Sequence, residues 1–258
     1  MRQCRSKNET YIAIVAAAGL SERMGSFKPL LDLGGKPALF RLIDSIRAAG
    51  IVTIIVVTGH ERESVEESLG LYTSSCAFSK ENDSKNTIYR LLTIYNEDYK
   101  TGMFSSVKTG IGKVSEMLKN AGFPAQNHVA SLLFLADVPL VSTETINGLI
   151  REYEDFCLST FCLGKKESSS QISVGPEPFA VPIFKGKNGH PLLIPRGYYD
   201  EILSYPGEGG LKAIRNKYKD SMIRYETSDA GCVLDMDTKD DYAALLEYLK
   251  SKEASIGK

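Results

Sequence analysis

Short apolar segments alternate along the chain with segments that carry apolar residues at helical spacing. Three of them are nearly continuous runs of Ile, Val, Leu and Ala, at Tyr11–Ala16, Ile51–Val57 and Ser131–Ala136. Runs of this length and composition are typical of strands that are buried on both faces of a parallel sheet. We therefore expect these three segments to be neighbouring parallel strands.

Four further segments carry apolar residues three and four positions apart, which is the spacing of an amphipathic helix. These apolar stripes, in chain order, are Leu39, Leu42, Ile43 and Ile46; Val107, Ile111, Val114 and Leu118; Ile146, Leu149, Ile150 and Tyr153; and Ala243, Leu246 and Leu249. The first helix is expected over Pro37–Ala49, because Gly50 is a natural stop. The third is expected to begin at Ser142 or Thr143, with Glu144 in its first turn.

This alternation predicts an α/β fold: a single-domain, Rossmann-like, doubly wound and mostly parallel sheet with helices on both faces. A small β-hairpin is expected within Pro182–Pro191. The folded domain is expected over 11–250, with an N-terminal tail at 1–10 and a C-terminal tail at 251–258. Two polar stretches, Tyr72–Asn86 and Leu163–Pro178, are interpreted as surface loops, although a domain boundary near 160–178 stays open.

Composition and charge exclude several classes of protein. The 258 residues are 43% hydrophobic, and 31 Lys+Arg against 32 Asp+Glu give a net charge of −1. The apolar fraction argues against disorder, and the absence of a basic excess argues against broad nucleic-acid binding. We expect no membrane span, because no apolar run approaches the roughly 20 residues required, and no signal peptide. The odd number of cysteines without CxxC spacing indicates reduced thiols, so a cytoplasmic location is expected.

The loop after the first strand carries the strongest chemical signal. Small residues including Gly19 end the strand, and Ser21, Arg23 and Lys28 follow within ten residues. Ligands of open α/β sheets bind at this edge, where a serine, backbone N–H groups and two cations can hold phosphate oxygens. The spacing matches neither the Walker A motif nor the dinucleotide fingerprint. A tight turn with two solvated cations is the alternative that the residues alone leave open.

The pattern Ala-Ala-Gly-x-Ser-x-Arg-Met-Gly-x-x-Lys, followed by Leu-Leu-x-Leu-Gly-Gly-Lys-Pro, resembles the signature of MobA/MocA-type nucleotidyltransferases. That family includes molybdenum cofactor cytidylyltransferases and guanylyltransferases. The resemblance implies that the loop wraps a nucleoside triphosphate and that Arg23 and Lys28 contact its phosphates as catalytic groups. It also implies nucleotide contacts from Ala17, Ala18, Gly19 and Ser21.

Acidic residues follow two further segments of the sequence. Asp137 ends the third apolar strand, where it can serve as a Mg²⁺ ligand or simply cap the turn before Pro139. The segment around it resembles the family's Asp-x-Pro motif, whose Asp holds the metal. Near the C-terminus, Asp235 and Asp237 resemble a second family motif. They are expected to alternate at a strand end and face opposite ways, so that one reaches the metal; we favour Asp235.

Two more segments resemble family motifs. Asn96–Ser106 is similar to Asn-x-x-Tyr-x-x-Gly-Met-x-Ser-Ser, which implies that Gly102, Ser105 and Ser106 bind the base or ribose. One of the two serines is also expected to cap the helix that follows. The segment ending in His190 is similar to Gly-x-x-Gly-His-Pro, and His190 is a candidate for contact with the acceptor's phosphate.

The resemblance implies transfer of CMP from CTP to the phosphate of molybdopterin or molybdenum cofactor, with release of pyrophosphate and with Mg²⁺ as cofactor. Such an enzyme would serve a molybdenum hydroxylase, and no nucleic acid or membrane partner is expected. The methyl group of Ala18, where the guanylyl branch keeps Gly, favours CTP over GTP. Two alternatives stay open: nucleotidyl transfer to a sugar or polyol phosphate, and a non-catalytic accessory protein that delivers the cofactor.

Overall fold

The computed structural model describes residues 10–19, 27–74, 89–122, 129–164 and 177–256. The elements in chain order are β1 (Thr10–Ala16), η1 (Lys28–Leu30), α1 (Ala38–Ala48), β2 (Thr53–Thr58), α2 (Arg62–Ser74), β3 (Arg90–Tyr95), η2 (Tyr99–Thr101), α3 (Met103–Asn120), β4 (Val129–Leu135), α4 (Thr143–Gly164), β5 (Ala180–Phe184), β6 (Lys187–Asn188), β7 (Leu192–Pro195), η3 (Arg196–Tyr198), α5 (Tyr199–Ser204), α6 (Gly210–Lys217), β8 (Ile223–Glu226), η4 (Ala230–Cys232) and α7 (Lys239–Ile256).

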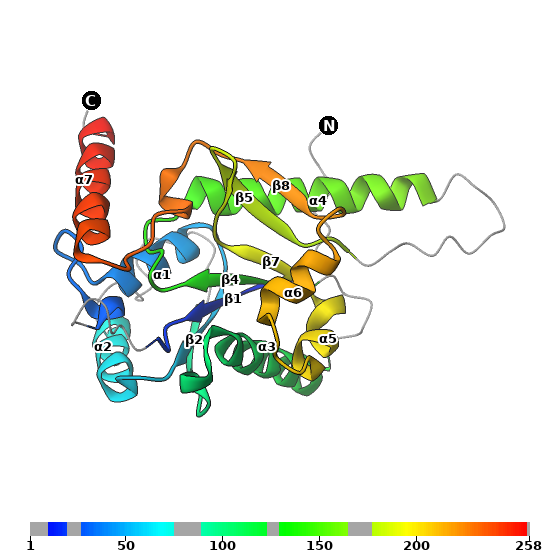
Figure 1. The fold of residues 1–258 in the computed structure, drawn as a ribbon, viewed down its shortest axis with the longest axis horizontal. Helices are drawn as coiled ribbons and strands as arrows, with labels where there is room; N and C mark the ends of the chain where they lie inside the picture. Colours follow the sequence, from blue (N-terminus) through cyan, green and yellow to red (C-terminus); the bar gives the residue numbers. More distant parts are fainter. Residues whose placement is uncertain (1–9, 20–26, 75–88, 123–128, 165–176, 257–258) are drawn as a thin grey trace.

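The described strands form one sheet in the order β3-β2-β1-β4-β7-β5-β6, and β8 pairs with β5 (Figure 1). The strands β3, β2, β1 and β4 run parallel, with Ile14 of β1 opposite Ile55 of β2 and Leu133 of β4. β7 runs antiparallel to β4 and to β5, and the short β6 forms a hairpin with β5. The predicted α/β class, the mostly parallel sheet and the hairpin are therefore confirmed.

Helices cover both faces of this sheet because successive residues of a buried strand point to opposite sides. Val15 of β1 lies in a cluster with α1, α2 and α4, whereas its neighbour Ile14 lies in a cluster with α3, α5 and α6. In Figure 1, α3 and α5 lie together below the strands. Among the helices in the described ranges, none has the length and apolar character needed to cross a membrane.

The helices extend further than the polar composition suggested. α2 continues to Ser74, into the stretch from Tyr72 that was interpreted as a loop, because the Tyr72 ring is buried and stacks on Phe40 of α1 with 4.3 Å between ring centroids. α7 continues to Ile256, past the point where a C-terminal tail was expected. The residues after 250 include good helix formers, and the first glycine among them is Gly257.

A buried carboxylate connects the C-terminal segment to the start of α4. Ser142 caps α4, since its Oγ accepts a hydrogen bond from the Thr145 N–H at 3.2 Å. Asp229 accepts from the Ser142 N–H at 2.8 Å, the Thr145 hydroxyl at 2.9 Å and the Tyr248 hydroxyl of α7 at 2.7 Å. Burial alone raises the pKa of Asp229, but these donors outweigh it and the net shift is downward. The carboxylate therefore fixes the chain that leads from η4 to α7.

The contact between α3 and β1 allows a matched pair of substitutions. A Cβ on Gly110 would lie 2.5 Å from Ile14 Cγ2, whereas a Cβ on Gly112 meets only Leu203 Cδ2, at 3.8 Å. We expect Gly110→Ala to lower the free energy of unfolding by about 1–3 kcal/mol through overpacking. Gly112→Ala should raise it by roughly 0.5–1 kcal/mol through helix propensity. Urea unfolding of both variants measures the difference, and equal stabilisation by both would contradict the packing.

Candidate functional site

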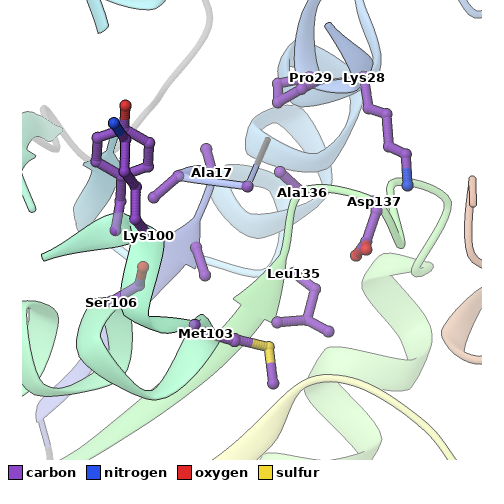
Figure 2. A pocket seen from close by; sticks show the side chains of 14 residues that line it. Ala17, Lys28, Pro29, Lys100, Met103, Ser106, Leu135, Ala136 and Asp137 are labelled. Carbon is purple, nitrogen blue, oxygen red and sulfur yellow. The ribbon is translucent and has the colours of Figure 1, made fainter. Parts of the chain in front are cut away.

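A cavity of about 290 Å³ lies where the carboxyl ends of β1 and β4 meet the start of α3. The lining residues are Ala16, Ala17, Ala18, Gly19, Lys28, Pro29, Tyr99, Lys100, Gly102, Met103, Ser106, Leu135, Ala136 and Asp137. Figure 2 shows Lys28 and Asp137 together on one side of this cavity, with Lys100 and Ser106 on the other. The cavity thus has one side that carries the Lys28 cation and the Asp137 acid close together, and another that carries the Lys100 cation and the Ser106 hydroxyl.

Backbone hydrogen bonds bring the ends of the central strands together. The Ala17 N–H donates to the Val57 carbonyl at 2.9 Å, and the Ala136 N–H donates to the Ala16 carbonyl at 3.1 Å. The second bond continues the β1–β4 ladder by one residue and places Asp137 directly beyond it. Parallel strands end at the same edge of a sheet, so loops that are far apart in the sequence meet here.

Gly59, just after β2, allows this close approach. A Cβ there would lie 2.7 Å from Ala18 Cβ and 2.6 Å from Tyr99 Cβ, which is closer than real Cβ atoms come. The loop after β1 and the turn before α3 therefore pack against each other across a residue that must be glycine. Their spacing sets the width of the cavity between Ala18 and Tyr99.

Lys28 begins the short η1 helix and extends its side chain toward the segment that holds Asp237. Its Nζ donates to Asp237 Oδ1 at 2.7 Å, and only 12% of the side chain is exposed. The buried Pro29 follows it and anchors the turn. The ammonium group is therefore held at the cavity by an ion pair with the segment that precedes α7.

Asp137 is the acid of the site, and it is partly buried. Its Oδ1 is buried and has no hydrogen-bond partner among the residues that the structure describes. Burial raises the pKa of this carboxyl, the Lys28 ammonium lowers it, and the carboxylates of Asp237 and Asp235 raise it again. The net shift is upward, so in the absence of a ligand the charge on Asp137 is incompletely compensated.

Asp235 and Asp237 correct one expectation. The segment that holds them is irregular, and it follows the η4 turn rather than a strand. Between them, Met236 is fully buried against Leu33 and Leu245. Both carboxylates lie near enough to Asp137 to raise its pKa, so the expectation that only one of them faces the site was wrong. Asp237 also forms the ion pair with Lys28. The pKa of Asp235 is itself raised, by partial desolvation of its carboxylate and by the nearby charge of Asp237.

The donor set fits a small divalent cation. Mg²⁺ prefers carboxylate oxygens and binds through one or two of them, together with water and substrate phosphates. The unpartnered Oδ1 of Asp137 and the carboxylate of Asp235 are ligands of this kind. Within the described ranges no cluster of three or more His, Cys, Asp or Glu side chains could hold a metal ion. An ion bound here would therefore take its remaining ligands from water or from substrate oxygens.

The two serines at the start of α3 do not cap the helix. The N-cap is Gly102, with φ 113°, a conformation that favours glycine. Ser105 and Ser106 lie one turn inside, and the side chain of Asn96 donates to both hydroxyl oxygens, at 2.8 and 3.0 Å. Gly102 and Ser106 line the cavity, whereas Ser105 is not among its lining residues. The prediction that a serine caps α3 was wrong because the turn before it requires a positive φ.

His190 lies just before β7, outside the lining of the cavity. Its Nδ1 is buried without a partner among the described residues, and burial lowers its pKa to about 4, against a hydrogen bond with the Leu133 backbone that favours the charged form. The imidazole is therefore neutral near pH 7, and it could meet a phosphate only as a neutral group.

Two of the expected site residues, Ser21 and Arg23, lie outside the described residues. The cavity is also lined by Tyr99, Lys100 and Met103, which were not among the predicted site residues. They belong to the Asn96–Ser106 motif, so their position between a strand end and a helix start was the signal that could have identified them.

Residues 13–222 match the model of the MobA-like NTP transferase domain. This chain belongs to that family. Among curated proteins it is similar to the bifunctional protein GlmU of Staphylococcus saprophyticus, with 28% identity over 145 residues. That match takes in 55% of this chain and only 26% of the GlmU length, so this chain corresponds to about a quarter of that relative.

Solved structures share the fold over nearly the whole chain. Rv0371c from Mycobacterium tuberculosis H37Rv has a TM-score of 0.62 and 20% identity, covering 93% of this chain and 98% of its own. Molybdopterin-guanine dinucleotide biosynthesis protein A from Archaeoglobus fulgidus has a TM-score of 0.54 and 14% identity, covering 93% and 98%. At these identities the likeness supports the fold alone.

The charges around Asp137 predict opposite effects from two substitutions. Lys28→Met removes the cation that lowers the pKa of Asp137, so that pKa should rise. Asp237→Asn removes a like charge that raises it, and also frees Lys28, so the pKa of Asp137 should fall. Carboxyl ¹³C NMR titration of the ligand-free protein measures both. Shifts in the same direction would contradict the electrostatic arrangement.

Proposed function

We propose that this protein transfers CMP from CTP to the phosphate of a molybdopterin-type acceptor and releases pyrophosphate. The observation that carries the proposal is that one cavity has Lys28 and Asp137 on one side and Ser106 on the other. A nucleoside triphosphate has the same division, with a charged tail and a hydrogen-bonding nucleoside. Family membership supports the reaction class.

The proposed reaction needs little covalent chemistry from the protein. An oxygen of the acceptor's phosphate forms a bond to the α-phosphorus, and the bond from that phosphorus to the pyrophosphate oxygen breaks. The attacking phosphate is already ionised near neutral pH, so no general base is required. Positioning and charge compensation are therefore the main contributions of the chain. Lys28 would leave Asp237 and neutralise the negative charge that develops on the departing pyrophosphate. Arg23 would assist it and Ser21 would hold phosphate oxygens, although both lie outside the described residues.

Asp137 and Asp235 are the residues that would hold Mg²⁺. The ion, when bound, would supply Lewis-acid polarisation of the phosphate oxygens. The buried and unpartnered Oδ1 of Asp137 supports this assignment, because an oxygen in that condition gains most from a cation. The role of Asp237 in this scheme is to hold Lys28 until the triphosphate arrives.

Ala18 supports CTP as the nucleotide. Its side chain is 4% exposed and lines the cavity, and its Cβ approaches the chain at Gly59. A methyl group at this position narrows the space for a purine. Ala17 and Gly19 would provide the remaining surface of the loop against which the nucleotide lies, and Gly102 and Ser106 would bind the nucleoside, with Ser105 behind them.

The acceptor is proposed to lie beside Met103, which lines the cavity and is 56% exposed. An apolar side chain in that position suits a flat ring system such as a pterin. His190 would meet the acceptor only as a neutral hydrogen-bonding group. A molybdenum hydroxylase would then receive the product.

The Asp137 assignment predicts a specific loss of activity. We expect Asp137→Asn to fold normally and to lower the rate of pyrophosphate release by about a hundredfold or more, because the buried ligand charge is lost. Asp240→Asn is the matched control, since Asp240 is exposed in the first turn of α7 and is expected to keep full activity. A folded Asp137→Asn enzyme with near-normal turnover would contradict the metal role.

Thermal-shift titration with CTP, GTP and ATP in the presence of Mg²⁺ tests the choice of nucleotide. A ligand that binds only the folded state raises the melting temperature by mass action, by an amount that grows with its affinity. CTP should give the largest rise. Equal rises with all three nucleotides would contradict the base assignment, and pyrophosphate release with molybdopterin against sugar phosphates then identifies the acceptor.

A further inference from the structure

Asn96 is a buried polar residue to which the proposed reaction assigns no role. It follows β3 directly, its side chain is 2% exposed, and its backbone N–H donates to the Thr58 carbonyl at 2.8 Å. Its side-chain amide has one hydrogen-bond partner in the turn before α3, Asp98, and three within α3 itself: Ser105, Ser106 and Thr109. A buried amide with every donor and acceptor satisfied holds one orientation.

The orientation of this amide follows from its partners. Asn96 Oδ1 accepts from the Asp98 backbone N–H at 3.1 Å, and it lies 3.3 Å from the Thr109 hydroxyl, whose one proton can also go to the Ser105 carbonyl at 3.0 Å. A backbone N–H can only donate, so the oxygen end of the amide must face it. The Nδ2 end therefore faces the two serines, and both serine oxygens act as acceptors.

The two serine hydroxyl protons then have different destinations. Ser105 Oγ can donate to the Asp98 carbonyl at 2.9 Å or to the Gly102 carbonyl at 2.8 Å. For Ser106, the part of the chain that the structure describes offers no hydrogen-bond acceptor, although this residue is only 4% exposed and lines the cavity. The Ser106 proton is therefore directed toward the cavity, where water accepts it in the free protein and a bound ligand can replace that water.

We propose that Asn96 is a positioning residue that fixes the Ser106 hydroxyl as a hydrogen-bond donor to the nucleoside. The site would then select a nucleoside that presents an acceptor atom there, either a base carbonyl oxygen or a ribose hydroxyl. This inference rests on the proposed nucleotide binding. Ser106 lies on the side of the cavity away from Lys28 and Asp137, where the nucleoside and not the triphosphate would lie (Figure 2).

Asn96→Asp reverses the direction of the hydrogen bond between residue 96 and the Ser106 hydroxyl. An aspartate offers no N–H, so the Ser106 hydroxyl would donate to it and present lone pairs to the ligand. We expect the Kd for CTP with Mg²⁺ to rise about 10–100-fold, as for a buried polar contact left unmade. The new negative charge also repels the nucleotide, so the substitution is measured in two backgrounds. In a Ser106→Ala background its effect should shrink by about tenfold or more, because the hydroxyl that it reverses is gone.

Thr109→Val is the matched control, because Thr109 belongs to the same network but does not line the cavity. It should change the Kd less than about twofold and leave the full effect of Asn96→Asp. Asn96→Ala is the second variant, in case the aspartate prevents folding. It should weaken CTP binding a few-fold in the wild-type background and not at all in the Ser106→Ala background.

Equal losses from the Asn96 substitutions in all backgrounds would overturn the proposal, because they would reflect general damage or charge. A wild-type protein that binds no nucleotide would overturn the proposed function and this inference with it. Repeating the cycle with 2′-deoxy-CTP tests the ribose 2′-hydroxyl as the acceptor. Coupling that disappears assigns the 2′-hydroxyl, and coupling that persists assigns a base carbonyl or the 3′-hydroxyl.

Discussion

A partly buried carboxylate at the end of a parallel strand is the constraint on which the site depends. Asp137 lies at that position because the ladder between β1 and β4 continues through the Ala136 N–H. Removing a charge from water is costly unless a partner compensates it. Here the compensation is partial: Lys28 lowers the pKa of Asp137, while burial and two further carboxylates raise it. A cation bound near Asp137 would therefore complete the compensation of its charge.

The C-terminal segment reaches this site through a second buried carboxylate. Asp229 joins the start of α4 to α7, and Met236 inserts between Leu33 and Leu245. These contacts place Asp235 and Asp237 beside a loop that comes roughly two hundred residues earlier in the chain. The charges around the cavity thus depend on packing at the far end of the sequence. This is the contribution of α7, which holds the segment of Asp235 and Asp237 in place.

The central strands and most helices could be predicted from the sequence because their apolar patterns are long and regular. The motif after β1 and the acid after β4 could be placed at one edge of the sheet because parallel strands end at the same edge. Local conformation was harder. Gly102 rather than a serine begins α3, because the turn needs a positive φ that no apolar pattern reports. The Asp235–Asp237 segment was misjudged because it is held by its own buried Met236, which packs against Leu33 and Leu245, and not by pairing with a neighbouring strand.

The most direct test is a crystal structure of the protein with Mg²⁺ and a CTP analogue that cannot be cleaved. The triphosphate should lie between Lys28 and Asp137, and the cytidine should lie against Ser106. A nucleotide bound elsewhere, such as in the cavity lined by Arg41, Ser142 and Lys252 beside α7, would contradict the assignment of the site.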